Sequence, residues 1–263
     1  MNIEELKRVI KEKNAILFVG AGISATLGLP TWNDLISKMG KDLGYDPDLF
    51  KEYGDNLMLS EYYSLVKGRI GELRSWMDEN WRISKQKVRE STIYETIANL
   101  GFPLIYTTNY DHCLEIAFEV FNKKYKRIID VDDLVKIDNN ITQIVKFHGD
   151  TVSDESIVLT ESSYFQRLGF ESPLDIKLRS DMLGKTVLFV GYSLSDINIR
   201  LLIYKLDQLW KKSNISQRPK SYVFLPTPNP IQQRIFESRG IITVVGEKLD
   251  KKESTEDFLK SLL

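Results

Sequence analysis

The chain has 263 residues, enough for one large hydrophobic core with an insertion. Its 36 Lys and Arg nearly cancel its 37 Asp and Glu, and the formal net charge of -1 argues against direct binding to nucleic acid or anionic lipid. The single cysteine, Cys113, excludes an internal disulfide and any site built from several thiolates, such as a four-cysteine zinc site.

The first segment, 3–13, is charged and has helical spacing, unlike the apolar core of a secretion signal. No apolar run in the chain approaches the roughly 20 residues that cross a bilayer. We therefore expect a cytoplasmic protein with no membrane partner.

Six short apolar runs rich in β-branched residues are predicted to be buried strands: 15–19, 104–108, 143–147, 186–190, 221–225 and 241–245. Most are separated by segments with helical spacing: 31–43, 91–100, 111–121, 195–211 and 230–238. This alternation predicts an α/β fold with a Rossmann-like, doubly wound parallel sheet of about six strands. The interval 46–81 contains no strand candidate, and we interpret it as a helical insertion within a single domain spanning 1–263.

A glycine-containing loop, residues 18–35, follows the first predicted strand and enters a helical pattern. Gly20 and Gly22 would let the backbone approach a ligand closely, and free N–H groups at a helix start favour a pyrophosphate. The spacing departs from G-x-G-x-x-G because Ala25 stands at the third glycine position. The alternative is a tight turn that uses glycine for its geometry alone.

Polar side chains follow the second predicted strand in Thr107-Thr108-Asn109-Tyr110-Asp111. Open α/β sheets bind ligands at the carboxyl ends of their strands, so Asn109 and Asp111 are candidates for a site. Asp111 could instead cap the following helix, a role worth about 1 kcal/mol, and the two roles can coexist.

Two histidines limit the choice of a general base near neutral pH. His148 follows the third predicted strand, beside Gly149, which permits a tight turn. His112 is interpreted as a surface or packing residue.

The fourth predicted strand ends at Gly191-Tyr192-Ser193, after which Ser195 or Asp196 begins a helix. Gly191 and Ser193 are therefore candidates for a turn that faces a ligand. Asp196 and Asn198 could face the same site, although a helix cap and a polar helix face explain them nearly as well.

These four segments, in this order, resemble the motifs of the sirtuin family. Gly20-Ala21-Gly22-Ile23-Ser24 matches its G-A-G-I-S loop, and Trp32 stands at the aromatic of its G-I-P-D-F-R segment, with Thr31 and Asn33 replacing the acidic and arginine positions. Residues 107–111 resemble T-Q-N-I-D, and His148-Gly149 resembles the catalytic His-Gly pair. Gly191-Tyr192-Ser193 resembles G-[TS]-S, and more closely the G-Y-S-x-x-D-x-N form of bacterial sirtuin-like defence proteins.

The resemblance implies roles for these residues. Asn109 would orient the ribose or the attacking water, Asp111 would hold the nicotinamide carboxamide, and His148 would act as the base. Binding of NAD would rest on a larger set: Gly20, Ala21, Gly22, Ser24, Trp32, Gly191 and Ser193.

Deacylating sirtuins carry a small zinc domain with two C-x-x-C pairs, which one cysteine cannot supply. The resemblance is closest to NAD hydrolases of bacterial antiphage systems such as Thoeris, and to those paired with HerA-type ATPases or short Argonautes. It implies hydrolysis of NAD to nicotinamide and ADP-ribose without a metal, in a triggered effector with a possible partner of these kinds. We also expect a homo-oligomer, because assembly can gate a toxic activity and the Tyr-, Leu- and Met-rich insertion offers apolar surface. An NAD-dependent protein deacylase and a non-catalytic sensor of NAD or ADP-ribose are the alternatives.

Overall fold

The computed structural model describes residues 3–68, 70–136, 138, 140–152, 156–212 and 218–263. Within these ranges seven parallel strands form one sheet in the order β3-β4-β2-β1-β5-β6-β7. The strands are β1 (Ala15–Val19), β2 (Leu104–Thr107), β3 (Tyr125–Ile128), β4 (Thr142–Lys146), β5 (Thr186–Val190), β6 (Ser221–Leu225) and β7 (Ile241–Val245). The predicted α/β class and the doubly wound parallel sheet are confirmed.

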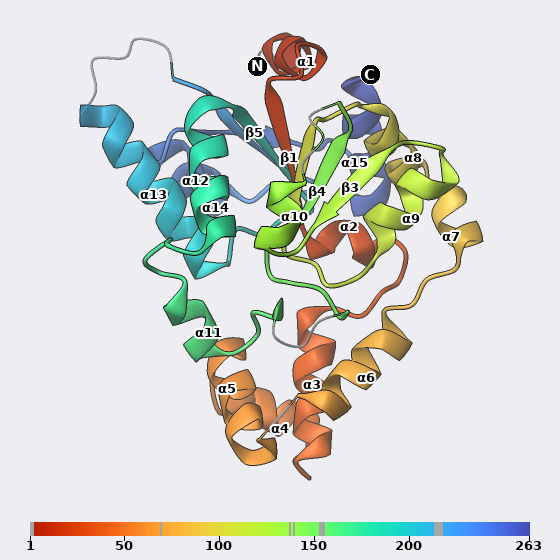
Figure 1. Ribbon diagram of the computed structural model, residues 1–263, viewed down its shortest axis with the longest axis vertical. Coiled ribbons are helices and arrows are strands. Elements are labelled where there is room, and N and C mark those ends of the chain that lie inside the picture. The colour runs from red at the N-terminus through yellow and green to blue at the C-terminus, as the bar shows by residue number, and fades with distance from the viewer. Residues whose placement is uncertain (1–2, 69, 137, 139, 153–155, 213–217) are drawn as a thin grey trace.

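The sheet is covered by helices on both faces (Figure 1). The helices are α1 (Ile3–Lys11), α2 (Ala21–Ala25), α3 (Trp32–Asp42), α4 (Pro47–Glu52), α5 (Asn56–Lys67), α6 (Gly71–Asn80), α7 (Lys85–Arg89), α8 (Thr92–Asn99), α9 (Cys113–Val120), α10 (Val131–Val135), α11 (Glu161–Gln166), α12 (Pro173–Gly184), α13 (Ile197–Lys212), α14 (Pro230–Ser238) and α15 (Lys251–Ser261). No helix in the described ranges is long and apolar enough to cross a membrane.

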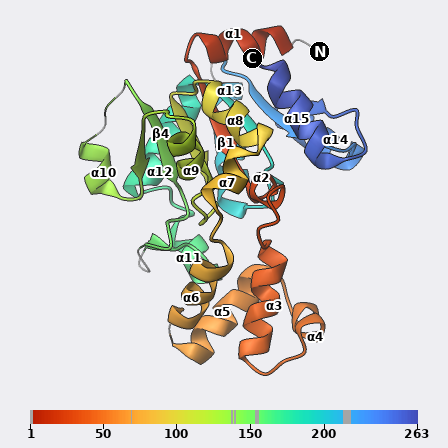
Figure 2. The same ribbon diagram turned by 90° about the vertical axis from the view of Figure 1, so that its right-hand side faces the viewer.

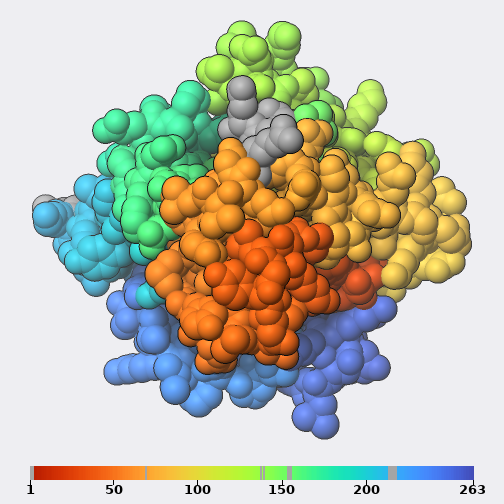
Figure 3. Space-filling view, turned by 90° about the horizontal axis from the view of Figure 1, so that it is seen from below, coloured from red at the N-terminus to blue at the C-terminus, as the bar shows by residue number. Residues whose placement is uncertain are grey.

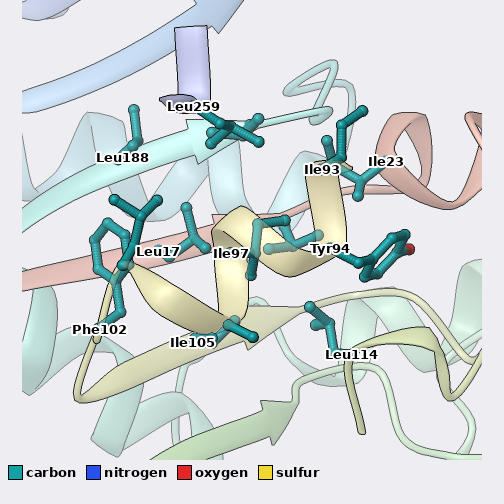
Figure 4. Packing of buried hydrophobic residues seen from close by; sticks show 14 of the residues in the cluster. Leu17, Ile23, Ile93, Tyr94, Ile97, Phe102, Ile105, Leu114, Leu188 and Leu259 are labelled. Atoms are coloured by element: carbon teal, nitrogen blue, oxygen red, sulfur yellow. The ribbon is translucent and has the colours of Figure 1, made fainter. Parts of the chain in front are cut away.

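The strands at the centre of the sheet are largely apolar because both of their faces are buried. In β1, Leu17 and Val19 pack on the face covered by α1, α8, α9 and α15, whereas Ile16 and Phe18 pack against α12 and α13. Figure 4 shows the first of these cores, with Leu17 lying between helix and strand residues. Burying one such side chain contributes about 1.5–3 kcal/mol.

A second body of helices lies below the carboxyl edge of the sheet (Figures 1 and 2). We call α3, α4, α5, α6 and α11 the helical layer. Its own apolar core includes Met39 from α3, Phe50 from α4, Tyr63 from α5 and Met77 from α6. Viewed from below, residues of this layer face the viewer over the middle of the molecule (Figure 3).

The interval 46–81 holds α4, α5 and α6, between the N-cap residue Asp46 and the C-cap residue Trp81. The apolar core that these helices share reaches beyond that interval, because α3 and Leu159 also contribute to it. The helical layer is thus larger than the predicted insertion.

Strand β3 and helices α7, α10, α11, α12 and α15 have no counterpart among the predicted elements. Strand β3 pairs only with β4, at the edge of the sheet, and its residues Tyr125, Lys126 and Arg127 are half-buried, so it shows no apolar run. Helices α12 and α15 bury few apolar side chains along largely polar sequences. In each of these elements the apolar residues are too few to form a recognisable pattern, and the element is held in place by packing against its neighbours.

Candidate active site

The four sequence motifs meet at one edge of the sheet. The central strands stand in the order β4-β2-β1-β5, all parallel, so the loops that leave their carboxyl ends are neighbours. A cleft of about 780 Å³ lies there, within the range of roughly 300–1,000 Å³ common for small-molecule sites.

Residues from the sheet side and from the helical layer line this cleft. The sheet side and its loops contribute Ala21, Gly22, Ser24, Thr108, Asn109, Tyr110, Asp111, His148, Gly191, Tyr192, Ser193, Ser195, Asp196, Ile197 and Arg200. The helical layer and its flanking residues contribute Pro30, Trp32, Asp55, Asn56, Leu57, Trp81 and Tyr164. Every predicted site residue except Gly20 therefore lies at the cleft.

Ser24, Asn109 and Asp111 form one hydrogen-bonded group. The Asn109 amide nitrogen donates to Ser24 Oγ at 3.1 Å, and Ser24 Oγ donates to Asp111 Oδ2 at 2.7 Å. The hydroxyl of Tyr94 lies 3.3 Å from Ser24 Oγ, behind the cleft, where the ring packs in the core of Figure 4. Asn109 is only 8% exposed, so its side chain is held in one orientation.

Asp111 performs both roles left open by the sequence. Its Oδ1 accepts the backbone N–H of Cys113 at 3.0 Å, at the start of α9, while Oδ2 faces Ser24. The thiol of Cys113 is buried, and burial raises its pKa, so it is an inert neighbour rather than a nucleophile.

His148 is almost fully buried, with 2% of its surface exposed. Its Nδ1 lies 3.3 Å from the hydroxyl of Tyr164, and its Nε2 lies 3.0 Å from Oδ2 of Asp196. Gly149 has a φ of +85°, and a Cβ there would lie 2.0 Å from the backbone oxygen of Ser156. The turn after His148 therefore requires glycine.

Asp196 also lies at the beginning of a helix. Its Oδ1 accepts the backbone N–H groups of Asn198 at 2.8 Å and Ile199 at 3.2 Å, which caps α13. Burial alone would raise the pKa of Asp196, but the adjacent His148 and the two N–H donors outweigh burial and lower it. The carboxylate is therefore ionised beside the imidazole.

At Gly20 the glycine loop lies against the loop after β5, and not against the cleft as the sequence predicts. A Cβ at Gly20 would lie 2.4 Å from the backbone oxygen of Gly191, and one at Gly22 would lie 2.8 Å from it. The N–H of Gly22 donates to that oxygen at 2.8 Å, so it is not free for a phosphate in this conformation. The glycines let two loops touch, which corresponds to the turn interpretation, while Ala21, Gly22 and Ser24 still line the cleft.

The opposite loop combines a partly buried aromatic with exposed hydroxyls. Gly191 has a φ of +63°, and Tyr192 packs its ring against Phe18, with centroids 4.8 Å apart. Ser193 is exposed at the cleft, with its Oγ 2.8 Å from that of Ser195. Ser193 can therefore reach a ligand, whereas Tyr192 anchors the loop.

The helical layer supplies an aromatic wall. Trp32 is half-buried and lines the cleft at the predicted position. Trp81 stacks on Tyr110 with centroids 5.5 Å apart, and its indole N–H donates to the carbonyl of Pro30 at 3.1 Å. The Tyr110 hydroxyl donates to the carbonyl of Val158 at 2.6 Å, which ties this wall to the segment after His148.

Several cleft residues were not predicted. Tyr164 lies on α11, and Asp55, Asn56 and Leu57 lie at the start of α5, where no motif marks them. Arg200, on α13, is the one Lys or Arg side chain among the described residues that line the cleft. In the described part of the chain, no group of three His, Cys, Asp or Glu residues is arranged to hold a metal ion.

A family model described as a SIR2-like domain matches residues 103–244, which include Asn109, His148 and Gly191. The chain belongs to the SIR2-like domain family. The resemblance to sirtuins drawn from the motifs is thereby confirmed.

Curated relatives cover most of the chain. It is 29% identical over 219 residues to a protein of Bacillus cereus (strain MSX-D12) named NAD(+) hydrolase ThsA, covering 80% of this chain and 43% of that protein. It is 25% identical over 249 residues to Defense-associated sirtuin 2 of Bacillus subtilis, covering 91% of this chain and 24% of that protein. The chain thus spans less than half the length of these relatives.

Among solved structures, one titled "Structure of Sir2Tm bound to a propionylated peptide" aligns with 99% of this chain and 98% of its own, at 14% identity and a TM-score of 0.42.

Proposed function

We propose that the chain hydrolyses NAD at the bond between nicotinamide and ribose, releasing nicotinamide and ADP-ribose. The observation that carries this proposal is the convergence of Asn109, Asp111 and His148 on one cleft, at the ends of adjacent parallel strands. Relatives named NAD(+) hydrolase support NAD as the substrate.

The cleft offers suitable contacts for a dinucleotide. The Trp32 ring supplies an apolar surface, and Ser193 supplies a hydroxyl at the loop after β5. Because the N–H of Gly22 is already bonded, we assign the charge of Arg200 a part in holding the phosphates. Gly22 and Ala21 would provide close backbone contact.

The reaction breaks one C–N bond and forms one C–O bond. Nicotinamide leaves with the electron pair of the broken bond, and a water oxygen attacks the ribose carbon on which positive charge develops. Asn109, held by Ser24, would orient the ribose or the water, and Asp111 would hold the departing carboxamide. His148 would accept the proton that the water loses.

The decisive experiment is a nicotinamide-release assay on the purified chain, with and without a peptide that carries an acylated lysine. We expect release without peptide. Release that depends on the peptide would show a deacylase, and tight NAD binding by folded protein without any release would show a sensor. Either of these results would overturn the proposal.

We further propose a triggered, NAD-depleting role in antiphage defence, which the name of the Bacillus subtilis relative supports. A homo-oligomer is part of this proposal. Large apolar side chains are exposed on α4 and α5, among them Leu49, Leu65 and Val66. A light-scattering mass of one chain, together with full activity across a wide dilution range, would remove the oligomer from the proposal.

A further inference from the structure

The environment of His148 gives each ring nitrogen a different partner. Nε2 lies 3.0 Å from Oδ2 of Asp196, at ion-pair distance rather than in an aligned hydrogen bond. Within the described residues neither of these two buried atoms has an aligned hydrogen bond, and the equally buried Tyr192 hydroxyl also interacts with the Asp196 carboxylate. Because buried polar atoms are nearly always paired, each is the natural partner of the other.

A carboxylate beside one nitrogen decides which tautomer the neutral ring adopts. The pKa of Asp196 is lowered despite burial, so the group is an anion that can only accept a hydrogen bond. The proton of neutral His148 then belongs on Nε2, facing Asp196. This leaves Nδ1 as the basic nitrogen.

Tyr164 occupies the position in front of that basic nitrogen. Its hydroxyl lies 3.3 Å from Nδ1, and its ring meets the imidazole edge-on with centroids 5.0 Å apart. Burial raises the pKa of Tyr164 far above neutrality, so the hydroxyl keeps its proton and can donate it to Nδ1. Tyr164 and His148 both line the cleft.

The backbone around this group is held in place. Arg167 donates through Nη1 to the carbonyl of Phe147, and it forms an ion pair with the buried Asp175. These contacts fix the end of β4 immediately before His148. The relative positions of His148 and Tyr164 are therefore built into the fold.

We propose that Asp196, His148 and Tyr164 form a proton relay, an inference that rests on the proposed function. Asp196 is the positioning residue, which holds the Nε2 proton and stabilises the imidazolium. The attacking water passes a proton to the Tyr164 oxygen as the Tyr164 proton moves to Nδ1, so tyrosine stays neutral and one positive charge appears on His148. That charge lies beside the Asp196 carboxylate.

The first test reads the tautomer and does not depend on turnover. The chain has only two histidines, so nitrogen NMR of protein labelled at histidine can be assigned with His112→Gln. We expect neutral His148 to carry its proton on Nε2. A proton on Nδ1 would overturn the relay.

The second test uses Asp196→Asn, because asparagine caps helices as well as aspartate and should preserve the start of α13. Asp250→Asn is the matched control: Asp250 caps α15 through the N–H of Glu253 and does not line the cleft. We expect both variants to melt close to the wild type. Only Asp196→Asn should lose kcat, by about 10- to 100-fold, with KM little changed.

The pH profile separates a positioning role from a structural one. Without the carboxylate charge the imidazolium is less stable, so the acid limb of kcat should move to lower pH in Asp196→Asn. Tyr110 and Tyr192 also face the cluster, and burial raises their pKa values, so both hydroxyls stay neutral near neutral pH. The charged side chains nearby are those of Arg167 and Arg200. Tyr164→Phe should lower kcat about tenfold and leave the acid limb in place.

The outcomes distinguish the relay from the proposed function. If His148→Ala is inactive while Asp196→Asn keeps the wild-type rate and pH profile, the relay is wrong and NAD hydrolysis stands. If the wild-type protein releases no nicotinamide, the proposed function fails, and the relay fails with it whatever tautomer the NMR measurement finds.

Discussion

The two sides of the cleft differ in how their side chains are held. On the sheet side, the short polar groups Ser24, Asn109 and Asp111 are fixed by hydrogen bonds of 2.7–3.1 Å to one another and to the backbone at the start of α9. On the side of the helical layer, Trp32 and Trp81 present large rings held mainly by packing. The fixed polar groups therefore lie at the sheet edge, where Tyr164 of the layer joins them at His148, while the two tryptophans shape the cleft.

The two sides are nevertheless joined by the segment that follows His148. The Ser60 hydroxyl of α5 donates to the carbonyl of Leu159 at 2.9 Å, and Glu61 accepts the N–H of Ser162 at 2.9 Å. These contacts hold α5 against the segment that leads to α11, and α11 carries Tyr164 to His148. Substitutions on the sheet side and at Tyr164 should lower the rate, and substitutions of the tryptophans in the layer should weaken affinity.

The largest effect is expected from His148→Ala. Loss of the base should lower kcat by about 10²- to 10⁴-fold while NAD affinity is largely kept. His112→Ala is the control for turnover, which should be kept because His112 lies outside the cleft, while its melting temperature should fall because the contact with Asp150 is lost. Nicotinamide release and the melting temperature should be measured together. Near-normal turnover in folded His148→Ala would contradict the assignment of the catalytic chemistry to the sheet side.

Asn109→Ala should follow, with a loss in kcat of about 10²-fold because the reacting groups are no longer oriented. The fold should survive, since the Ser24 hydroxyl keeps its bond to Asp111. Asn99→Ala, at the exposed end of α8, controls for the loss of an asparagine. A rise in KM with kcat unchanged would show that Asn109 contributes to NAD binding and not to the chemical step.

Trp32→Ala tests the other side of the cleft. Losing the ring should raise KM about tenfold, equivalent to about 1.4 kcal/mol, and leave kcat within about threefold. Trp210→Ala, on α13 outside the cleft, is the control for loss of a tryptophan. If kcat falls more than KM rises, Trp32 takes part in the chemistry rather than in NAD binding alone.

The same difference explains which parts could be predicted from the sequence. The central strands have apolar runs because both of their faces are buried. Asn109 and His148 follow two of these strands, so their position alone identifies them as candidate site residues. Strand β3 has polar residues because it is an edge strand, so its pattern does not identify it.

The layer's contribution to the cleft could not be predicted in the same way. Tyr164 and Asn56 reach the cleft only because α11 and α5 pack below the sheet, a tertiary contact without a local signal. Asp196 could not be assigned from the sequence because one oxygen caps α13 while the other meets His148. Gly20 was assigned to ligand binding because close approach to a ligand and to another loop require the same residue.

The last expected effect is on stability and not on turnover, at the pair formed by His112 and Asp150 on the sheet side. Nε2 of His112 lies 2.7 Å from Oδ1 of Asp150, whose side chain is fully buried. Burial alone would raise the pKa of Asp150, but His112 and nearby donors outweigh it and lower the pKa to about 2. The same contact raises the pKa of His112 above its ordinary value of 6.5.

The two shifts have opposite consequences for stability. The contribution of Asp150 is present above its ordinary pKa of 3.8 and is lost as pH falls through about 2, while that of His112 is present below 6.5 and is lost as pH rises through its raised pKa. The pair should therefore stabilise the fold most between these limits, by about 1–2 kcal/mol after discounting for solvent. Melting temperatures from pH 2 to 8 should show this advantage in the wild type and in Asp130→Asn, an exposed helix cap, but not in Asp150→Asn. An identical pH profile in Asp150→Asn would mean that the contact adds nothing, and that rigidity at the sheet edge comes from packing instead.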